Sequence, residues 1–556
     1  MKEETKGLYA AIMLSVLIIF AVNYFFPANE PVNSAQEAPI PEVAANTSIA
    51  NTQGTATLLS ADEIVKVEKR VPIKNANLNG SLRLKGARFD YLTLTKYKET
   101  LENNSPDIEL LYPAGTQNQY FAELGWLSSN QSLKLPTSDT EWKLKGKELT
   151  PQSPITLEWD NGQGLRFIRT ISVDENYLFN ITQTVENNTA EDVVLYPYGL
   201  ISRSFTAESS RQSAVVHEGI SSVIDGSLEE IKYKNLKENK PETFEVSEGW
   251  TGFSDRYWFT AFIFNGAQKN DLKFANNGND SYQIDYRGAP LTIASGAAAS
   301  ENLRFFAGAK EIKLLDEYAD KANIKKFDLA VDFGWYYFLT KPFFYILTFL
   351  YGIIGNMGWA ILLFAALLRL AMFPIANKSY DSMSKMKKIQ PKIAELQEKY
   401  KNDKMLMQQA TMDLYRREKI NPASGCLPMF IQIPVFFSLY KVLNISIEIR
   451  HAPFIGWIKD LSAPDPLTIS VWSHIPLPSL LDIGIWPILM GLTMWMQQKL
   501  NPAPANKDQA RMFALMPLIF TLMLGHFASG LVIYWTLSNV LSILQQRAIM
   551  RKNGVK

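Results

Sequence analysis

The sequence contains almost no cysteine and very little histidine. The single cysteine, Cys426, can form neither an internal disulfide nor a cysteine cluster that holds a metal ion. The four histidines, His217, His451, His474 and His526, are widely scattered and lack the close spacing of metal ligands. We therefore expect no metal site and no cofactor.

The chain also lacks a large net charge of either sign and lacks recognisable catalytic motifs. Its 56 Lys and Arg residues are balanced by 55 Asp and Glu residues, so the overall charge does not point to nucleic acid as a partner. It contains no phosphate-binding glycine loop, no paired carboxylates within an apolar segment and no Ser/His or Cys/His arrangement of known spacing. These absences predict a protein that is not an enzyme.

Long apolar segments, by contrast, are present near both ends. Leu8–Phe26 follows Lys2 and Lys6 and is long enough to cross a hydrocarbon core of ~30 Å. It predicts that residues 1–26 form an uncleaved membrane anchor with a cytoplasmic N-terminus; a cleaved secretion signal is the alternative. Residues 27–60 are rich in Ala, Asn, Pro, Ser and Thr, which predicts a flexible tether because so few apolar side chains can be buried.

Residues 61–324 show the alternation of apolar and polar side chains that is typical of β-strands. In the stretch "GLRFIRTISVD", Leu165, Phe167, Ile171 and Val173 fall on one face of an extended chain. Repeated segments of this kind, bounded by Gly and Asn clusters, predict half-buried antiparallel strands in one large β-sandwich. The domain is expected outside the cytoplasm because the preceding anchor begins inside.

Apolar segments after residue 324 predict a helical membrane region. Residues 325–356 contain an aromatic stretch broken by Lys341, Pro342 and Gly352, which favours a helix lying along the outer membrane surface over a span. With the anchor, six spans are expected, and the five that form the core (residues 357–549) are 357–376, 427–445, 485–498, 512–524 and 527–549. The segments between and after them are 377–422, 446–484, 499–511 and the basic tail 550–556.

Basic residues predict the orientation of these spans. Segment 377–422 carries eleven Lys and Arg residues, whereas loop 446–484 carries only Arg450 and Lys459. Because basic loops stay on the cytoplasmic side, we expect 377–422, 499–511 and both termini in the cytoplasm and 446–484 outside.

The large cytoplasmic segment predicts a helical hairpin. Its apolar residues recur in steps of three and four, at Met386, Ile389, Ile393, Leu396 and Tyr400. The exposed faces of the two helices are basic, through Lys385, Lys387, Lys388, Lys392, Arg416 and Arg417. The alternative is a solvated basic loop that only sets the topology.

One ionisable residue lies within a predicted span. Arg369, in "LLFAALLRLAMFPIANKSY", stands seven residues before Ala376 and thus ~10 Å inside the expected boundary, at a cost of at least ~2.5–3.5 kcal/mol. Its side chain could simply bend to the membrane surface. Alternatively, it could stay hydrated in a cavity open to the cytoplasm. Other predicted spans carry polar residues that could line such a cavity or merely hydrogen-bond between helices: Gln432, Gln497, Gln498, Ser538, Asn539, Ser542 and Gln545.

Five motifs in the C-terminal part of the chain are recognisable together. They are "LLRLAMFPIANKSYDSMSKMKKIQPKIAELQEKY", "INPASGCLPMFIQIPVFFSLYKVL", "APFIGWIKDLSAPDP", "ILMGLTMWMQQKLNP" and "FASGLVIYWTLSNVLSILQQ". They closely resemble the YidC/Oxa/Alb family of membrane protein insertases, in its bacterial Gram-negative form. The resemblance covers Asp332–Arg547 and extends more loosely over the β-domain, through "GWTGFSDRYWFTAFI" at Gly249–Ile263.

The resemblance implies a fold and a function. The fold is a polytopic α-helical membrane protein of six spans, whose five-helix core encloses a hydrophilic groove, with a large periplasmic β-supersandwich. The groove opens to the cytoplasm and laterally to lipid. The function is to insert inner-membrane proteins and help them fold, alone or with the Sec translocon. A transporter or channel, or a membrane-anchored glycan-binding protein of the periplasm, are the alternatives.

The resemblance also assigns roles to residues. The family's groove arginine matches Arg369, and its groove glutamine matches Gln498. Substrate-contact positions of the family match Ile433, Phe436 and Leu439 in the third predicted span and Tyr534 and Trp535 in the sixth. Gln432 is added to the predicted groove residues because it is a polar residue within the third span. The basic hairpin is similar to the family's recruitment element, which contacts translating ribosomes or nascent chains. The expected partners are thus nascent inner-membrane proteins, the Sec translocon, ribosomes and the lipid bilayer, without readout of nucleic-acid sequence.

Overall fold

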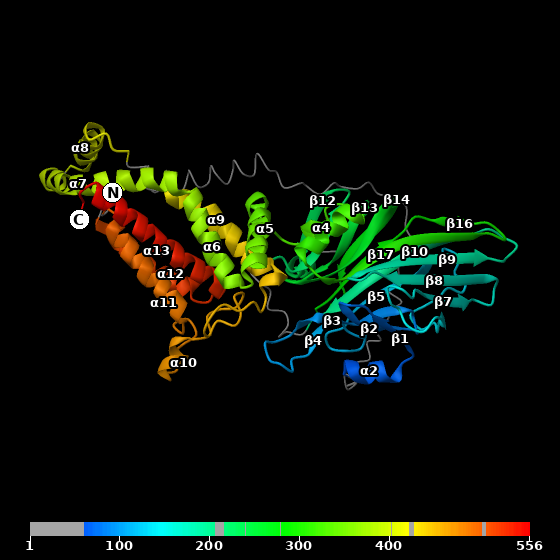
Figure 1. Ribbon diagram of the computed structural model, residues 1–556. Helices are drawn as coiled ribbons and strands as arrows, with labels where there is room; N and C mark the ends of the chain where they lie inside the picture. The colour runs from blue at the N-terminus through cyan, green and yellow to red at the C-terminus, as the bar shows by residue number, and fades with distance from the viewer. Residues whose placement is uncertain are drawn as a thin grey trace. The chain divides into compact units, whose positions relative to one another are not determined.

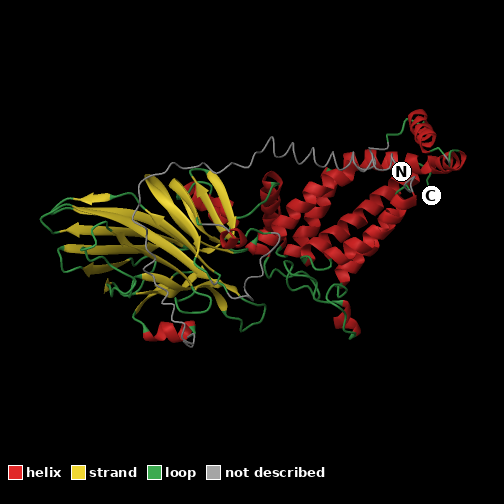
Figure 2. Cartoon of the chain, turned by 180° about the vertical axis from the view of Figure 1, so that it is seen from behind, coloured by secondary structure: helices red, strands yellow, loops and turns green. Residues whose placement is uncertain are grey.

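The structure is a computed structural model that describes residues 60–205, 216–238, 241–278, 280–401, 403–421, 427–502 and 507–555. The predicted anchor, and all of the predicted tether except its last residue, lie outside these residues. The described chain forms a β-domain followed by a helical region (Figures 1 and 2).

The β-domain is a system of antiparallel strands that runs from Arg70 to Ala309. Its strands are β1 Arg70–Lys74, β2 Leu78–Arg83, β3 Arg88–Lys98, β4 Asp107–Leu111, β5 Tyr120–Leu127, β6 Lys143–Lys145, β7 Ile155–Asp160, β8 Leu165–Val173, β9 Leu178–Asn187, β10 Val193–Ser204, β11 Gly219–Ile224, β12 Ser227–Lys232, β13 Glu242–Ser254, β14 Trp258–Asn276, β15 Ser281–Arg287, β16 Leu291–Ile293 and β17 Ala298–Ala309. Short helices accompany them: α2 Ala61–Val67, α3 Tyr233–Glu238, α4 Ile312–Lys321 and the 3-10 turn η1 Phe327–Ala330.

The predicted inward face of β8 is confirmed. Leu165, Phe167 and Ile171 are fully buried, as expected for alternate residues of a strand packed on one side. Arg169 lies on the same face and is also buried. Its guanidinium donates hydrogen bonds to the carbonyl oxygens of Ala87 (3.1 Å) and Leu124 (2.7 Å). These bonds offset part of the cost of burying the charge.

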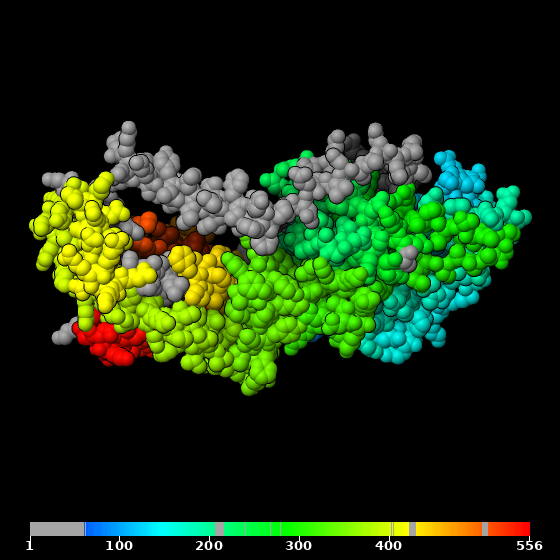
Figure 3. Space-filling view, turned by 90° about the horizontal axis from the view of Figure 1, so that it is seen from above, coloured from blue at the N-terminus to red at the C-terminus, as the bar shows by residue number. Residues whose placement is uncertain are grey.

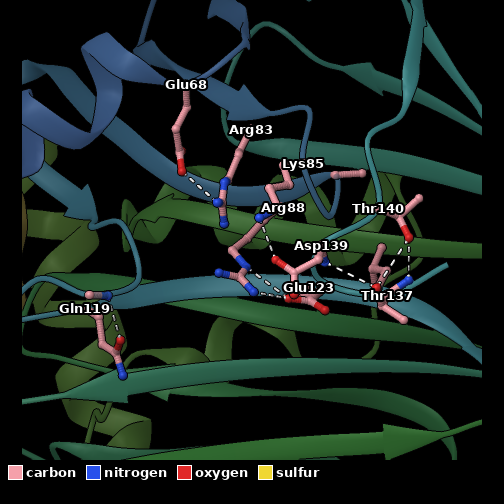
Figure 4. Close-up of polar contacts among 12 residues, drawn as sticks. Glu68, Arg83, Lys85, Arg88, Gln119, Glu123, Thr137, Asp139 and Thr140 are labelled. Carbon is pink, nitrogen blue, oxygen red and sulfur yellow. Dashed lines mark hydrogen bonds and ion pairs between the residues drawn. The ribbon is translucent and has the colours of Figure 1, made fainter. Parts of the chain in front are cut away.

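Ion pairs of two kinds lie in the first part of the β-domain. Arg88 of β3 and Glu123 of β5 form a buried pair, with the Nη2 and Nε atoms 2.5 and 2.9 Å from the same carboxylate oxygen. Lys85 and Asp139 form an exposed pair nearby, at 2.6 Å (Figure 4). The buried pair joins two strands that are far apart in sequence, whereas solvent screens the exposed one.

The helical region contains several long helices that pack side by side and a few short helical turns (Figure 1). They are α5 Tyr337–Ile354, α6 Met357–Ala371, α7 Phe373–Lys399, α8 Lys404–Arg417, α9 Leu427–Ile445, the 3-10 turn η3 Ile447–Ile449, α10 Ile469–Ser473, α11 Ile485–Leu500, α12 Lys507–Leu524 and α13 Ser529–Lys552. The central helix is α13, which contacts α6, α7, α9 and α11, while α12 packs on α11.

The predicted span 357–376 consists of two helices. α6 ends at Ala371, and α7 continues from Phe373 at an angle of 66°. Pro374 explains the break, because a proline disfavours helical geometry in the residue before it and cannot donate a backbone hydrogen bond. Arg369 consequently lies in the last turn of α6.

Length and composition alone identify few spanning helices among the described residues. α5 is long and apolar enough to cross a membrane, and the bent pair α6–α7 meets the same criterion if it counts as one span. Shorter apolar stretches occupy Phe430–Ile445 in α9 and Ala510–Leu524 in α12. The hairpin of α7 and α8 has its own small core, in which Ile389 and Ile393 pack with Ile420.

Candidate functional site

Arg369 joins α6 to α13. Its Nη2 atom donates hydrogen bonds to the carbonyl oxygen (2.9 Å) and hydroxyl (3.0 Å) of Ser538, and also to the hydroxyl of Ser542. The side chain is half-buried. Its position in the last turn of α6 is favourable for a cation, because the carbonyl end of a helix carries partial negative charge.

The two serines face the arginine because of their spacing on α13. Residues four apart lie above one another on a helix, so Tyr534, Ser538, Ser542 and Gln546 form one stripe. All four side chains are buried. The hydroxyl of Ser542 donates its own proton to the Ser538 carbonyl (2.6 Å), which leaves its oxygen free to accept from the guanidinium.

Part of the guanidinium has no protein partner. No carboxylate of the described residues forms an ion pair with Arg369, and its Nε and Nη1 atoms are neither hydrogen-bonded to described residues nor sealed from solvent. A guanidinium has five N–H donors, so donors remain for water or for an acceptor that enters from outside. The arginine is therefore held in place on one edge and available on the other.

The other predicted polar residues connect helices. Gln432 of α9 donates to the Tyr534 hydroxyl at 3.2 Å, and Gln498 of α11 donates to the carbonyl of Phe513 in α12. Asn539 donates to Thr493 of α11 at 3.2 Å. Gln545 donates to Asn377 of α7 at 2.8 Å. Interhelical hydrogen bonding thus accounts for these amide groups, while the side-chain carbonyl oxygens of Gln545 and Gln546 are buried and have no partner among the described residues.

An aromatic cluster adjoins the polar stripe. The Trp535 ring of α13 lies 4.6 Å from the Phe436 ring of α9 and 5.9 Å from the Phe520 ring of α12, between ring centroids. Tyr440 extends the cluster along α9 by stacking on Phe527 at 5.2 Å. Phe520 and Phe527 had no signal in the sequence beyond their aromatic character, because their partners lie on other helices.

The third predicted span presents its residues in different directions. Ile433 is 41% exposed, whereas Leu439 is fully buried. Phe436 is partly buried in the aromatic cluster. Seen from above, the surface is hollowed between the α7–α8 hairpin and α9, with the orange helices α11 and α12 set deeper (Figure 3). Ile433 alone among these three predicted contact residues therefore offers a large accessible surface.

The predicted basic residues of the hairpin divide into two groups. Three of them are paired within the hairpin: Lys385 with Asp381 (2.8 Å), Lys392 with Glu418 (2.7 Å) and Arg416 with Asp413 (3.8 Å). The other three, Lys387, Lys388 and Arg417, form no ion pair with the described residues. The second group is the one available to an acidic partner.

A polar junction that the sequence analysis missed ties α9 to the chain before α5. Lys441 lies 2.5 Å from Asp332, which also accepts the backbone N–H of His217 at 3.0 Å. Burial alone would raise the pKa of Asp332, but the ammonium of Lys441 holds this pKa below its usual range. Nearby, Arg256 of the β-domain donates to the carbonyl of Asn444 at 2.7 Å. These contacts fix the outer end of α9.

Comparison with known proteins gives consistent matches along the whole chain. The family model described as the YidC periplasmic domain matches residues 70–346, and the model described as 60Kd inner membrane protein matches residues 349–555. The membrane protein insertase YidC of Beijerinckia indica is 46% identical, covering 100% of this chain and 97% of the relative. That of Rickettsia felis is 44% identical and covers 100% of both. A crystal structure of an active YidC insertase with its first transmembrane domain resolved is 17% identical, with a TM-score of 0.37 over 86% of this chain and 92% of that one.

Proposed function

The chain belongs to the YidC family of membrane protein insertases, and from this premise we propose that its substrates enter beside Arg369 and leave past α9. The protein is an inner-membrane insertase with a periplasmic β-domain. In the proposal, the hydrophilic segment of an incoming membrane protein occupies the space at Arg369 and the polar stripe of α13. The apolar segment of the same substrate slides along α9 and α12 into lipid.

The observation that carries this proposal is the half-satisfied guanidinium. The arginine is held by Ser538 and Ser542, lacks an acidic partner among the described residues and keeps donors on its outer edge. Every guanidinium carries five N–H donors, so the donors that the two serines do not use need water or another acceptor. An acidic or polar substrate segment supplies the acceptors that they lack.

The physical advantage is that the polar segment of the substrate crosses a shorter stretch of water-free hydrocarbon. A polar segment that crosses hydrocarbon loses the water that hydrates its backbone groups, which costs several kcal/mol for each unsatisfied group. Polar side chains that lie partway into the membrane replace some of that water as hydrogen-bonding partners. The substrate's apolar segment then supplies the driving force, at ~25 cal/mol for each Å² of apolar surface removed from water. No covalent step is needed, so the proposal includes no catalytic residue.

The charge distribution supports the proposed topology and the proposed contact with ribosomes. The basic hairpin and tail support a multi-pass arrangement with both termini in the cytoplasm. The unpaired Lys387, Lys388 and Arg417 support a contact with acidic partners such as a translating ribosome. Cooperation with the Sec translocon rests on the family resemblance alone.

The experiment that tests the proposal is insertion into reconstituted vesicles. Single-span substrates with acidic, neutral and basic tails are compared between the wild type and Arg369→Glu. We expect acidic tails to be inserted most slowly by the variant, because two like charges replace an attraction of about 1 kcal/mol or more in a wet site. Leu370→Ala is the matched control, since its side chain is the exposed neighbour of Arg369. If Arg369→Glu inserts every tail at the same rate as the wild type, the role of the charge is refuted.

A further inference from the structure

The loop between α9 and α11 exposes apolar side chains at its tip. Residues 466–481 contain no Asp, Glu, Lys or Arg. Five large apolar side chains within this tip are exposed: Val471 (52%), Trp472 (55%), Ile475 (59%), Leu480 (65%) and Leu481 (46%). A patch of this kind on a protein surface marks a site of contact with another apolar surface.

The base of the loop is held firmly by two aspartates. Asp465 is buried and accepts hydrogen bonds from the Trp457 indole (2.9 Å) and the Trp486 backbone (2.8 Å). Asp482 accepts from the backbone (2.9 Å) and hydroxyl (2.6 Å) of Ser470. The exposed apolar side chains therefore extend from a loop whose base is held by hydrogen bonds to these two aspartates.

The tip lies beside the outer ends of the helices. His526, in the turn between α12 and α13, is hydrogen-bonded to the carbonyl of Ser479 at 2.8 Å. The short helix α10 lies within this loop, on the side of the helical region where α11 begins (Figure 1). Apolar side chains are also exposed on α11, at Leu489 and Leu492, and on α12, at Leu518.

We propose that the tip, residues 466–481, inserts shallowly into the periplasmic leaflet of the inner membrane. Three features favour lipid over a protein partner. The tip contains no Asp, Glu, Lys or Arg, Trp472 is of the type that accumulates at membrane interfaces, and the neighbouring helices α11 and α12 also expose apolar side chains. Pro476 and Pro478 also reduce the number of backbone donors that lose water. The tip forms an interfacial anchor that is separate from the proposed substrate path.

Spin labels on the full-length protein in vesicles of phosphatidylethanolamine and phosphatidylglycerol test this proposal. In a Cys426→Ser background, single cysteines replace Trp472, Ile475 or Leu480, and each label is tested for access to oxygen, which concentrates in lipid, and to a water-soluble nickel complex. Leu518 of α12 (58% exposed) is the lipid reference, and Leu101 of the β-domain (51% exposed) is the water reference.

We expect labels at 472, 475 and 480 to resemble the label at 518, with access to oxygen exceeding access to nickel. Access like that at 101 would overturn the proposal, and so would shielding from both reagents, which indicates a protein partner. A second variant checks the cause. Combining Trp472→Ser, Ile475→Ser and Leu480→Ser should move a label at Leu481 from lipid to water. A label that stays in lipid would show that these side chains do not hold the tip there.

Discussion

Arg369 and Ser538 are 169 positions apart in sequence, yet their side chains share a hydrogen bond of 3.0 Å that links α6 to α13. The bond gives the half-buried guanidinium a defined orientation. It also explains how a cation can be kept within an apolar region although no carboxylate of the described residues forms an ion pair with it. The same contact makes Ser538 and Ser542 targets for testing.

Removing both hydroxyls should weaken the connection between α6 and α13. For Ser538→Ala combined with Ser542→Ala, we expect a loss of about 1–3 kcal/mol in the free energy of unfolding, because hydrogen bonds to a charged group are among the stronger ones. Thermal unfolding in detergent measures the change. Thr536→Val is the control, since among the described residues its hydroxyl bonds only to the carbonyl of Val532 in its own helix. Equal losses in the double variant and in Thr536→Val would mean that the contact with Arg369 adds no more stability than a hydrogen bond within one helix.

Ribosome binding should depend on the unpaired basic residues of the hairpin. Replacing Lys387, Lys388 and Arg417 by Ala should reduce co-sedimentation with ribosomes by about fivefold or more at low salt, because three available charges are lost. Replacing their paired neighbours Lys385, Lys392 and Arg416 should have a smaller effect, since nearby carboxylates already neutralise them. The hypothesis fails if the two triple variants bind ribosomes equally well.

The β-domain should be sensitive to its buried ion pair. Arg88→Ala leaves the Glu123 carboxylate buried without its partner, for which a loss of about 3–5 kcal/mol in unfolding free energy is expected. Lys85→Ala removes a partner of the exposed pair and should cost about 1 kcal/mol or less. Replacing both members, as Arg88→Met with Glu123→Leu, should restore much of the loss. Denaturant unfolding of the full-length protein distinguishes these cases.

Glu301 should make the stability of the β-domain depend on pH. Burial raises its pKa to about 7 from an ordinary value of 4.5, while Gln183 and Arg169 oppose the shift. A carboxyl with a raised folded pKa contributes stability that is fully present below pH 4.5 and is lost as the pH rises through about 7. Glu301→Gln should therefore flatten the fall in unfolding temperature between about pH 5 and about pH 8. Glu148 is exposed, and Glu148→Gln should leave that fall unchanged. If the unfolding temperature of the wild type does not fall over this pH range, the prediction is contradicted.

Local patterns in the sequence predicted the elements better than their contacts. The alternation in β8 identified its buried face, but nothing nearby indicated that Arg169 on that face finds acceptors in β5 and beside β3. The Phe373–Pro374 step carries the signal for the break between α6 and α7. The apolar composition continues across this step, however, and composition alone therefore predicts a single span. Helix and strand periods are properties of neighbouring residues, and sequence can therefore show them.

The predicted groove residues illustrate the same limit. The spacing of Ser538 and Ser542 shows that they share a face of α13, but their contact with Arg369 depends on how two distant helices cross. The junction of Lys441 with Asp332 spans 109 positions and has no local signal at all. Such tertiary contacts depend on the packing of the whole helical region.

The most direct test of the substrate path is site-specific photocrosslinking to a stalled nascent membrane protein. A benzoylphenylalanine probe replaces Ile433 on α9 or, as a control of similar exposure, Leu363 on α6 (40% exposed). The account predicts strong crosslinks from 433 and few from 363, because only the first position borders the path past Phe436 and Trp535. Equal crosslinking from both positions, or crosslinks from 363 alone, would contradict it.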